Sequence, residues 1–240
     1  MKPDRSPLTK TPIGRLLIIA GPLLWAILIL FHPMPGGHGA FDGINEVVDR
    51  WLLVHVGQLI LTPFLFLAVW RLLDGLSTTA ATVSRCALVV WTVFFSAYDA
   101  VQGIATGVLV RHADGLPDPE QDAVAGALDY LVHDSRLAGD FSALQMVAGA
   151  AWLTVAFAAA VALHRANAGR AVVGCAVVST VFAAHVTPAA IGLLALFAAC
   201  VLREQQRTAP PSVAQTATAH PNLPPYETSH GITRPPQLQR

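Results

Sequence analysis

The fold is decided by residues 51–70, which read WLLVHVGQLILTPFLFLAVW. This run holds no Asp, Glu, Lys or Arg. As an α-helix it is long enough to cross a hydrocarbon core of about 30 Å, which takes about 20 residues. Trp51 and Trp70 stand at its two ends, about 28 Å apart at 1.5 Å per residue, as expected for the aromatic belts at the two faces of a bilayer. The run therefore predicts a transmembrane helix with well-defined ends.

The composition points to the same class of protein over the whole chain. Of its 240 residues, 54% are hydrophobic and 12% are charged, about half the charged share of an ordinary soluble domain. The 15 basic and 15 acidic residues balance, so no basic excess indicates a nucleic-acid partner. We expect an all-α, polytopic transmembrane bundle that the lipid bilayer covers over much of its surface.

Further apolar runs predict the other transmembrane helices. The last run, 171–202, is too long for one span, and Thr187 followed by Pro188 supplies an N-cap and a first-turn proline, which indicate that a new helix begins there. We expect two short helices joined by a tight turn; a single kinked helix is the alternative. The six predicted spans of the bundle (16–202) lie near 16–31, 51–70, 86–110, 141–163, 171–185 and 188–202.

Basic residues place both ends of the chain in the cytoplasm. Lys and Arg on short loops stay on the cytoplasmic side of a membrane. The N-terminal segment 1–15 is basic, and we interpret the apolar run after it as an uncleaved first span in the plasma (inner) membrane. With six spans, the side of the N-terminus holds Lys2, Arg5, Lys10, Arg15, Arg71, Arg85, Arg165, Arg170, Arg203 and Arg207, and the opposite side holds Arg50, Arg111 and Arg136.

The loop between the third and fourth spans predicts a helix outside the bilayer. Asp118 as N-cap, Pro119 at the first helical position and Gln121 as the capping-box partner indicate that this helix begins near residue 118. Its apolar side is formed by Val124, Leu128 and Leu131. We expect this amphipathic helix to lie on the outer membrane surface or to cover the bundle.

The last part of the chain, 203–240, changes abruptly to Pro, Gln and Thr. A segment of this composition cannot bury enough apolar surface to offset the entropy lost on ordering. We expect a disordered, Pro-rich cytoplasmic tail.

Asp99 is the most informative residue, because it is the only carboxylate inside a predicted span. A charge in the bilayer costs about 2.5–3.5 kcal/mol on insertion scales, so such a residue is expected to face protein or a water-filled cavity. Gly103 and Gly107 lie on the side of the helix that carries Asp99, and this GxxxG pair lets a helix of this chain or of a second copy approach closely.

Other polar residues fall on the same side of the membrane as Asp99 in this topology. His55 and Gln58 share one face of the second span. We expect Asp99 either to be largely protonated at neutral pH or to share a proton with His55. No spacing of a recognised catalytic or metal-binding motif is present. The candidates for an outward-facing polar cavity are Asp99, His55, Gln58, Tyr98, Gln102, Gln145 and His185.

Three functions remain open. The first, which we favour, is a non-enzymatic membrane protein that binds or conducts a small solute, ion or proton in the cavity around Asp99. The second is a metal-binding membrane protein or metal-dependent enzyme in which His55, Asp99 and His185 hold a divalent metal, because imidazole and carboxylate ligands suit zinc or iron. The third is a structural or accessory subunit whose polar residues only hold helices together.

Overall fold

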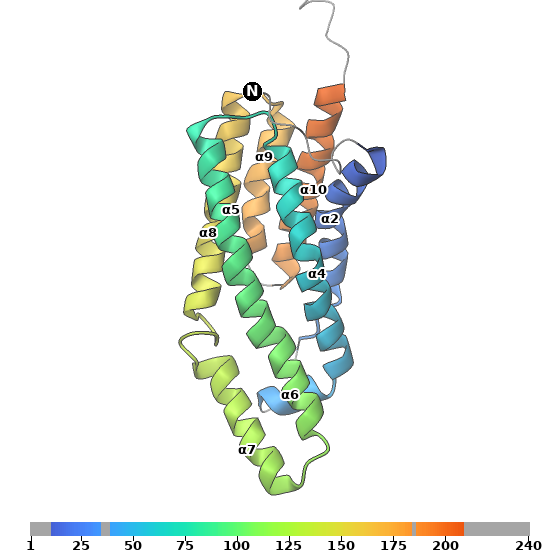
Figure 1. Cartoon of the computed structure of the whole chain (residues 1–240), viewed down its shortest axis with the longest axis vertical. Coiled ribbons are helices and arrows are strands. Elements are labelled where there is room, and N and C mark those ends of the chain that lie inside the picture. Colours follow the sequence, from blue (N-terminus) through green and yellow to red (C-terminus); the bar gives the residue numbers. More distant parts are fainter. Residues whose placement is uncertain (1–10, 35–38, 184–185, 209–240) are drawn as a thin grey trace, which may run out of the picture. The chain divides into compact units, whose positions relative to one another are not determined.

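The computed structural model describes residues 11–34, 39–183 and 186–208, and these residues are helical with no strand among them (Figure 1). Three short segments depart from α-helical geometry: η1 and η2 are π-helical, and η3 is a 3-10 helix. The elements are α2 (Pro12–Leu30), α3 (Ala40–Asn45), α4 (Val48–Leu72), α5 (Thr79–Tyr98), η1 (Asp99–Ala105), α6 (Thr106–Ala113), α7 (Asp118–Asp129), η2 (Tyr130–Asp134), α8 (Ala143–Arg165), α9 (Arg170–Val178), η3 (Ser179–Ala183) and α10 (Val186–Thr208).

Five stretches of helix are long and apolar enough to cross a membrane, which confirms the all-α class and the prediction of several membrane-length helices. The third is continuous through α5, η1 and α6, so it begins earlier and ends later than predicted. A shorter apolar helix, Arg170–Ala183, precedes the fifth. The five are Ile13–Leu30, Val48–Leu72, Thr79–Ala113, Ala143–Arg165 and Pro188–Thr208.

The last apolar run forms two helical segments that pack against each other. A Cβ added to Gly192 in α10 would lie 2.3 Å from the backbone nitrogen of Phe182 in η3. In one continuous helix, residues ten apart would be separated by about 15 Å. The chain therefore reverses direction between η3 and α10, and the alternative of a single kinked helix is wrong. His185, which belongs to the predicted turn between these two helices, lies outside the described residues.

Helix α10 continues to Thr208, so the boundary that we placed after Leu202 is wrong by about one and a half turns. The sequence after Leu202 reads as polar and unstructured, yet Glu204 and Arg207 have partners at the end of α4. These contacts extend the helix beyond its apolar part. The rest of the segment for which we expect disorder, residues 209–240, lies outside the described part of the chain.

The helix predicted outside the bilayer is present as α7. It begins at Asp118, although Pro117 rather than Asp118 is its N-cap. The Gln121 side chain donates a hydrogen bond to the carbonyl of Ala113 instead of closing a capping box. Leu128 is buried, and α7 packs against α3 and α6 at one end of the helix bundle (Figure 1). A second apolar cluster holds this end together: Ala40, Phe41, Ile44, Trp51, Val110, Ala113 and Leu128.

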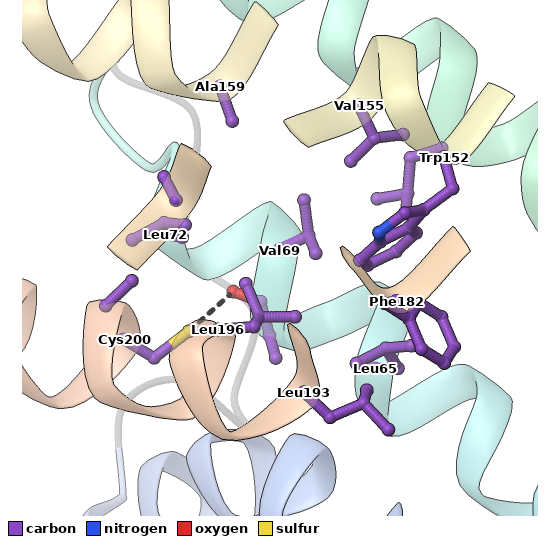
Figure 2. Packing of buried hydrophobic residues seen from close by; sticks show 14 of the residues in the cluster. Leu65, Val69, Leu72, Trp152, Val155, Ala159, Phe182, Leu193, Leu196 and Cys200 are labelled. Atoms are coloured by element: carbon purple, nitrogen blue, oxygen red, sulfur yellow. Dashed lines mark hydrogen bonds between the residues drawn. The ribbon is translucent and has the colours of Figure 1, made fainter. Parts of the chain in front are cut away.

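The main core is formed by residues of α2, α4, α5, α8, α9, η3 and α10. Figure 2 shows Leu65 and Val69 of α4 facing Leu193 and Leu196 of α10. The indole of Trp152 packs edge-on against the ring of Phe182, with 4.7 Å between ring centroids, and its Nε1 donates to the carbonyl of Ser179 at 2.9 Å. An indole N–H that is buried needs such an acceptor. Trp152 thereby fixes η3 against α8.

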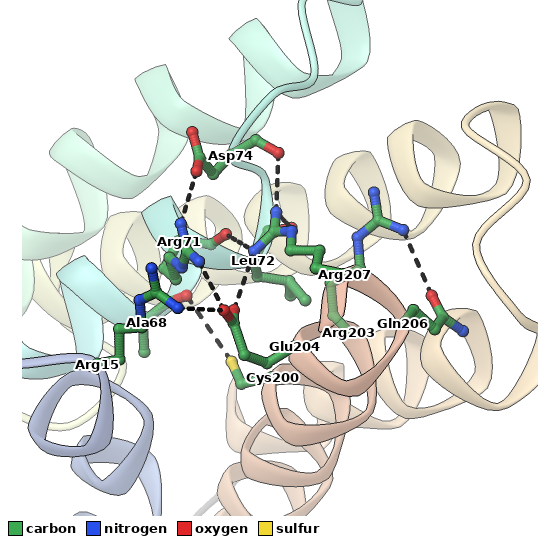
Figure 3. A network of polar contacts seen from close by, with 10 residues as sticks. All are labelled: Arg15, Ala68, Arg71, Leu72, Asp74, Cys200, Arg203, Glu204, Gln206 and Arg207. Carbon is green, nitrogen blue, oxygen red and sulfur yellow. Dashed lines mark hydrogen bonds and ion pairs between the residues drawn. The ribbon is translucent and has the colours of Figure 1, made fainter. Parts of the chain in front are cut away.

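A network of charged residues closes the end of the bundle opposite to α7 (Figure 3). Arg71 at the end of α4 donates to Asp74 and to Glu204, each at 2.7 Å. Arg207 donates to the carbonyls of Arg71 and Asp74, at 3.0 and 2.8 Å. The last carbonyls of a helix lack partners within the helix. Arg207 thus caps α4 and binds it to α10.

The beginning of α2 and the end of α10 lie at this same end of the bundle. Arg15 Nη1 in the first turns of α2 is 3.9 Å from Glu204 Oε1 in the last turns of α10. Within residues 11–208, the chain therefore enters and leaves the bundle on one side.

We predict that Glu204→Gln lowers the free energy of unfolding in detergent by about 1–3 kcal/mol, because Arg71, Arg207 and Arg15 then lose the carboxylate that they share. Glu46→Gln, which changes an exposed carboxylate at the end of α3, serves as the matched control and should change stability by less than about 0.5 kcal/mol. Equal effects of the two substitutions would show that the network does not stabilise the bundle.

Candidate functional site

A cavity of about 550 Å³ lies within the bundle, with walls from α2, α4, α5, η1, α8, η3 and α10. Met34 and Phe141 line it and are exposed at the surface, so the cavity reaches the end of the bundle near α7. Protein interiors hold few voids larger than a water molecule. A cavity of this volume lies within the range of sites that bind small molecules, about 300–1,000 Å³.

Six of the seven predicted candidates line this cavity. The seventh, His185, lies outside the described residues. The six come from three separate stretches of helix, α4, α5 with η1, and α8. They are His55, Gln58, Tyr98, Asp99, Gln102 and Gln145.

His55 and Asp99 form the polar centre of the wall. The Nδ1 atom of His55 is 2.7 Å from the Oδ1 atom of Asp99, and the two residues are 7% and 3% exposed. A buried carboxyl group needs a hydrogen-bond donor or an opposite charge to offset its lost hydration. The imidazole supplies the donor when its Nδ1 carries the proton. The pair predicted from the sequence is therefore in direct contact.

The chain brings these residues together by an unusual helix geometry and a glycine. Asp99 is the first residue of the π-helical segment η1, and π-helical turns inside α-helices often occur at functional sites. A Cβ added to Gly103 in this segment would lie 2.1 Å from His55 Nδ1. No larger residue leaves room for the imidazole. Gly103 also accepts a hydrogen bond at its carbonyl from Trp51 Nε1, at 2.7 Å.

Gln102 and Gln145 use their side chains to hold the backbone at the mouth of the cavity. Gln102 Nε2 donates to the carbonyls of Val132 and Ala138, which follow α7 in the chain. Gln145 Oε1 accepts from the backbone nitrogen of Phe141 at 2.8 Å. Both residues line the cavity. Their hydrogen bonds also hold the backbone of residues 132–141, which borders the cavity.

The backbone of this segment is strained at Phe141. Its φ angle is 53°, in the left-handed region that non-glycine residues rarely adopt. Such conformations persist where the surrounding contacts fix them, and they are frequent at binding sites. The next residue, Ser142, caps α8 by accepting from the backbone nitrogen of Gln145. The start of α8 therefore presents Phe141 at the rim of the cavity.

Three buried polar atoms of the cavity residues have no hydrogen-bond partner among the described residues. They are Asp99 Oδ2, His55 Nε2 and Trp25 Nε1. Most buried polar atoms in folded proteins are paired, and an unpaired one costs about 1–3 kcal/mol. All three atoms belong to residues that line the same cavity.

Aromatic residues that we did not select from the sequence make up much of the remaining wall. Four of the five tryptophans of the chain line the cavity. In the sequence they are scattered over four predicted spans, where they read as apolar membrane residues. Phe182 packs against three of them, Trp25, Trp91 and Trp152, with ring centroids 4.7–5.9 Å apart. His32 is also on the wall, 5.1 Å from the ring of His55.

The expected metal site has two of its three ligands together. His55 and Asp99 are in contact, but they bond each other, and no group of three His, Cys, Asp or Glu side chains arranged to hold a metal is found in the described part of the chain. The third expected ligand, His185, lies outside that part. The described geometry supports a hydrogen-bonded pair rather than a metal centre.

We predict that Gly103→Ala lowers the free energy of unfolding by about 1–3 kcal/mol, the usual cost of overpacking, because the new methyl group meets the ring of His55. Gly174→Ala in α9 is the control, because a Cβ there has no atom within 4 Å. It should be neutral or slightly stabilising, as alanine is the better helix former. An alanine at position 103 without cost would contradict the close approach of α4 to η1.

Comparisons with protein-family models, curated proteins and solved structures find no match for this chain. The functional inference therefore depends on the cavity and its His55–Asp99 pair.

Proposed function

We propose that this chain is a multi-pass protein of the plasma (inner) membrane that binds a small solute, or passes an ion or proton, in the cavity around Asp99. The single observation that carries the proposal is a cavity of about 550 Å³ with the buried His55–Asp99 pair in its wall. A carboxyl group among apolar helices is costly, and in membrane proteins such groups most often mark a substrate, ion or proton site.

The distribution of charge supports a membrane topology with both termini in the cytoplasm. One end of the bundle carries the basic side chains of Arg15, Arg71, Arg203 and Arg207, whereas the end that carries α7 is rich in acidic residues. Positive loops remain in the cytoplasm. The segment Arg170–Ala183 counts as a sixth, short span in this proposal, shielded from lipid by its longer neighbours.

We predict that tags before Met1 and after Arg240 are both inaccessible to membrane-impermeant reagents on intact cells, because an even number of spans returns the chain to its starting side. A cysteine introduced at exposed Asp122 in α7 should react from outside, in a background without the three native cysteines. Labelling of the C-terminal tag alone would show an odd number of spans and overturn this topology.

The cavity favours a binding role over a purely structural one. Polar groups that only join helices satisfy one another in a closed core, whereas here both residues of the pair line a cavity and each keeps a buried atom without a hydrogen-bond partner among the described residues. We favour binding or passage over catalysis, because no serine, threonine or cysteine side chain bonds His55 in the part of the chain that the structure describes. A histidine–carboxylate pair without a nucleophile can still hold and pass a proton.

The test is a thermal-unfolding screen of the detergent-solubilised chain against small solutes that are cationic, anionic or neutral. A ligand of the folded state raises the unfolding temperature by mass action. We predict that at least one chemical class does so for the wild type and that Gly149→Leu removes the effect. Gly149 lines the cavity and has no atom within 4 Å of an added Cβ, so leucine fills the space. Gly174→Leu is the control.

Asp99 variants separate a functional from a structural carboxyl group within the same screen. Asp99→Asn keeps the shape and the hydrogen bond and should unfold near the wild-type temperature, yet lose binding. Asp99→Leu should also lose about 1–3 kcal/mol of stability, because His55 is left without its partner. If Asp99→Asn binds every hit like the wild type, Asp99 only joins helices and the accessory-subunit alternative is the better one.

A further inference from the structure

We propose that the cavity takes a small organic cation, an ammonium group on an aromatic or aliphatic body, with the ammonium at Asp99. This inference rests on the proposed binding function and names its ligand class. It combines the charge of the cavity wall, its aromatic surface and the hydrogen-bonding capacity that remains at Asp99.

The charge of the wall has one sign. Asp99 lies inside the cavity and Asp140 at its rim, and no Lys or Arg is found among the described lining residues. The other titratable groups of the wall are His32, His55 and Tyr98. Asp140 is exposed and lies 3.2 Å from His133 Nδ1, whereas Asp99 is buried away from salt and water. An anionic ligand would face both carboxylates with no Lys or Arg of the described wall to pair with it, whereas a cation would be attracted.

The remaining hydrogen-bonding capacity also matches a donor-rich cation. Asp99 Oδ1 is engaged with His55 Nδ1, and Oδ2 has no partner. A carboxylate oxygen accepts hydrogen bonds, and charge-assisted bonds from ammonium groups are about twice as strong as neutral ones. The hydrogen bond from His55 Nδ1 satisfies one oxygen of the carboxyl group and leaves the other for a ligand. An ammonium group supplies the missing donor and a positive charge.

The aromatic wall suits the same ligand. Trp25, Trp91, Phe95, Trp152 and Phe182 line the cavity and contact one another, with ring centroids 4.7–5.9 Å apart. Indole and phenyl rings attract cations through their electron-rich faces, most strongly where water is excluded. They also bury an apolar ligand body by the hydrophobic effect. A neutral apolar molecule is stabilised by the hydrophobic effect but not by the attraction between a cation and the rings.

The experiment compares three probes with the same phenyl body and different head groups: phenethylammonium, phenethyl alcohol and 3-phenylpropionate. Binding to the full chain in detergent is followed at neutral pH by intrinsic fluorescence, since four of the five tryptophans line the cavity. We expect the ammonium probe to bind about tenfold more tightly than the alcohol, and the carboxylate to bind most weakly.

Two variants test where this selectivity arises. Asp99→Asn should remove the preference for ammonium over alcohol, because the variant lacks the negative charge that distinguishes the two probes. Gly149→Leu should weaken all three probes by filling the cavity, and Gly174→Leu, which changes a glycine with equally open space in α9, should change none. If Asp99→Asn unfolds, Asp99→Glu should retain the order of the three probes and gives the same test.

The outcomes separate this inference from the function on which it rests. Equal binding of ammonium and alcohol, abolished by Gly149→Leu, would leave a ligand-binding cavity and overturn the cation class. Tightest binding of the carboxylate would overturn it as well. Failure of all three probes overturns the inference, and the unbiased solute screen then decides whether the cavity binds any other class. Tightest binding of the ammonium that persists in Gly149→Leu would place the cation outside this cavity and also overturn the proposal.

Discussion

The hydrogen bond between His55 and Asp99 is the contact on which the arrangement of the bundle depends most. A carboxyl group in the middle of an apolar helix is tolerated only where it has a partner. That partner sits on α4, so α4 and η1 must approach to hydrogen-bonding distance, which is 2.7 Å between Nδ1 and Oδ1. The approach in turn demands a residue without a side chain at position 103. The His55–Asp99 pair thus requires glycine at position 103 and fixes the distance between α4 and η1.

Helix α4 carries this pair near one end and the charged network at the other. His55 lies two turns into α4, and Arg71 lies in its last turn, where it bonds Asp74 and Glu204. Between them the apolar residues of α4 pack against α10. Polar contacts therefore position both ends of α4, and the hydrophobic core fills the space between them. Because the contacts at the two ends involve different helices, η1 at one and α10 at the other, α4 is tied in place along its whole length.

The sequence predicts those features that are set by local pattern. Apolar run lengths predict the membrane-length helices, and Thr187-Pro188 lies in the first turn of α10, which begins at Val186 rather than at Pro188. The isolation of Asp99 among apolar residues is enough to select it, and the 3.6-residue period selects His55 and Gln58. These signals are all contained in one helix or one short segment.

The features that the sequence did not predict arise from contacts between distant segments. The extension of α10 past Leu202 depends on Arg71, more than a hundred positions earlier. The aromatic wall depends on Phe182, whose place next to Trp25 and Trp152 follows from the fold and not from any periodicity. Gln145 was selected as a cavity group, but its side chain also caps the start of α8, a role that depends on the unusual backbone at Phe141.

The cavity itself follows from unequal helix lengths. Helix α8 has 23 residues and spans about 34 Å, whereas α9 and η3 together, with nine and five residues, span about 23 Å. The shorter segment ends inside the bundle, and its last residues, Phe182 and Ala183, line the cavity. Of the α8 residues that line the cavity, Ala148 and Gly149 are small, whereas Gln145 and Trp152 are larger. A short helix beside small residues leaves volume that larger side chains would have filled, and the polar pair of α4 and η1 borders that volume. The shortness that makes Arg170–Ala183 a poor membrane span by itself therefore contributes to the cavity.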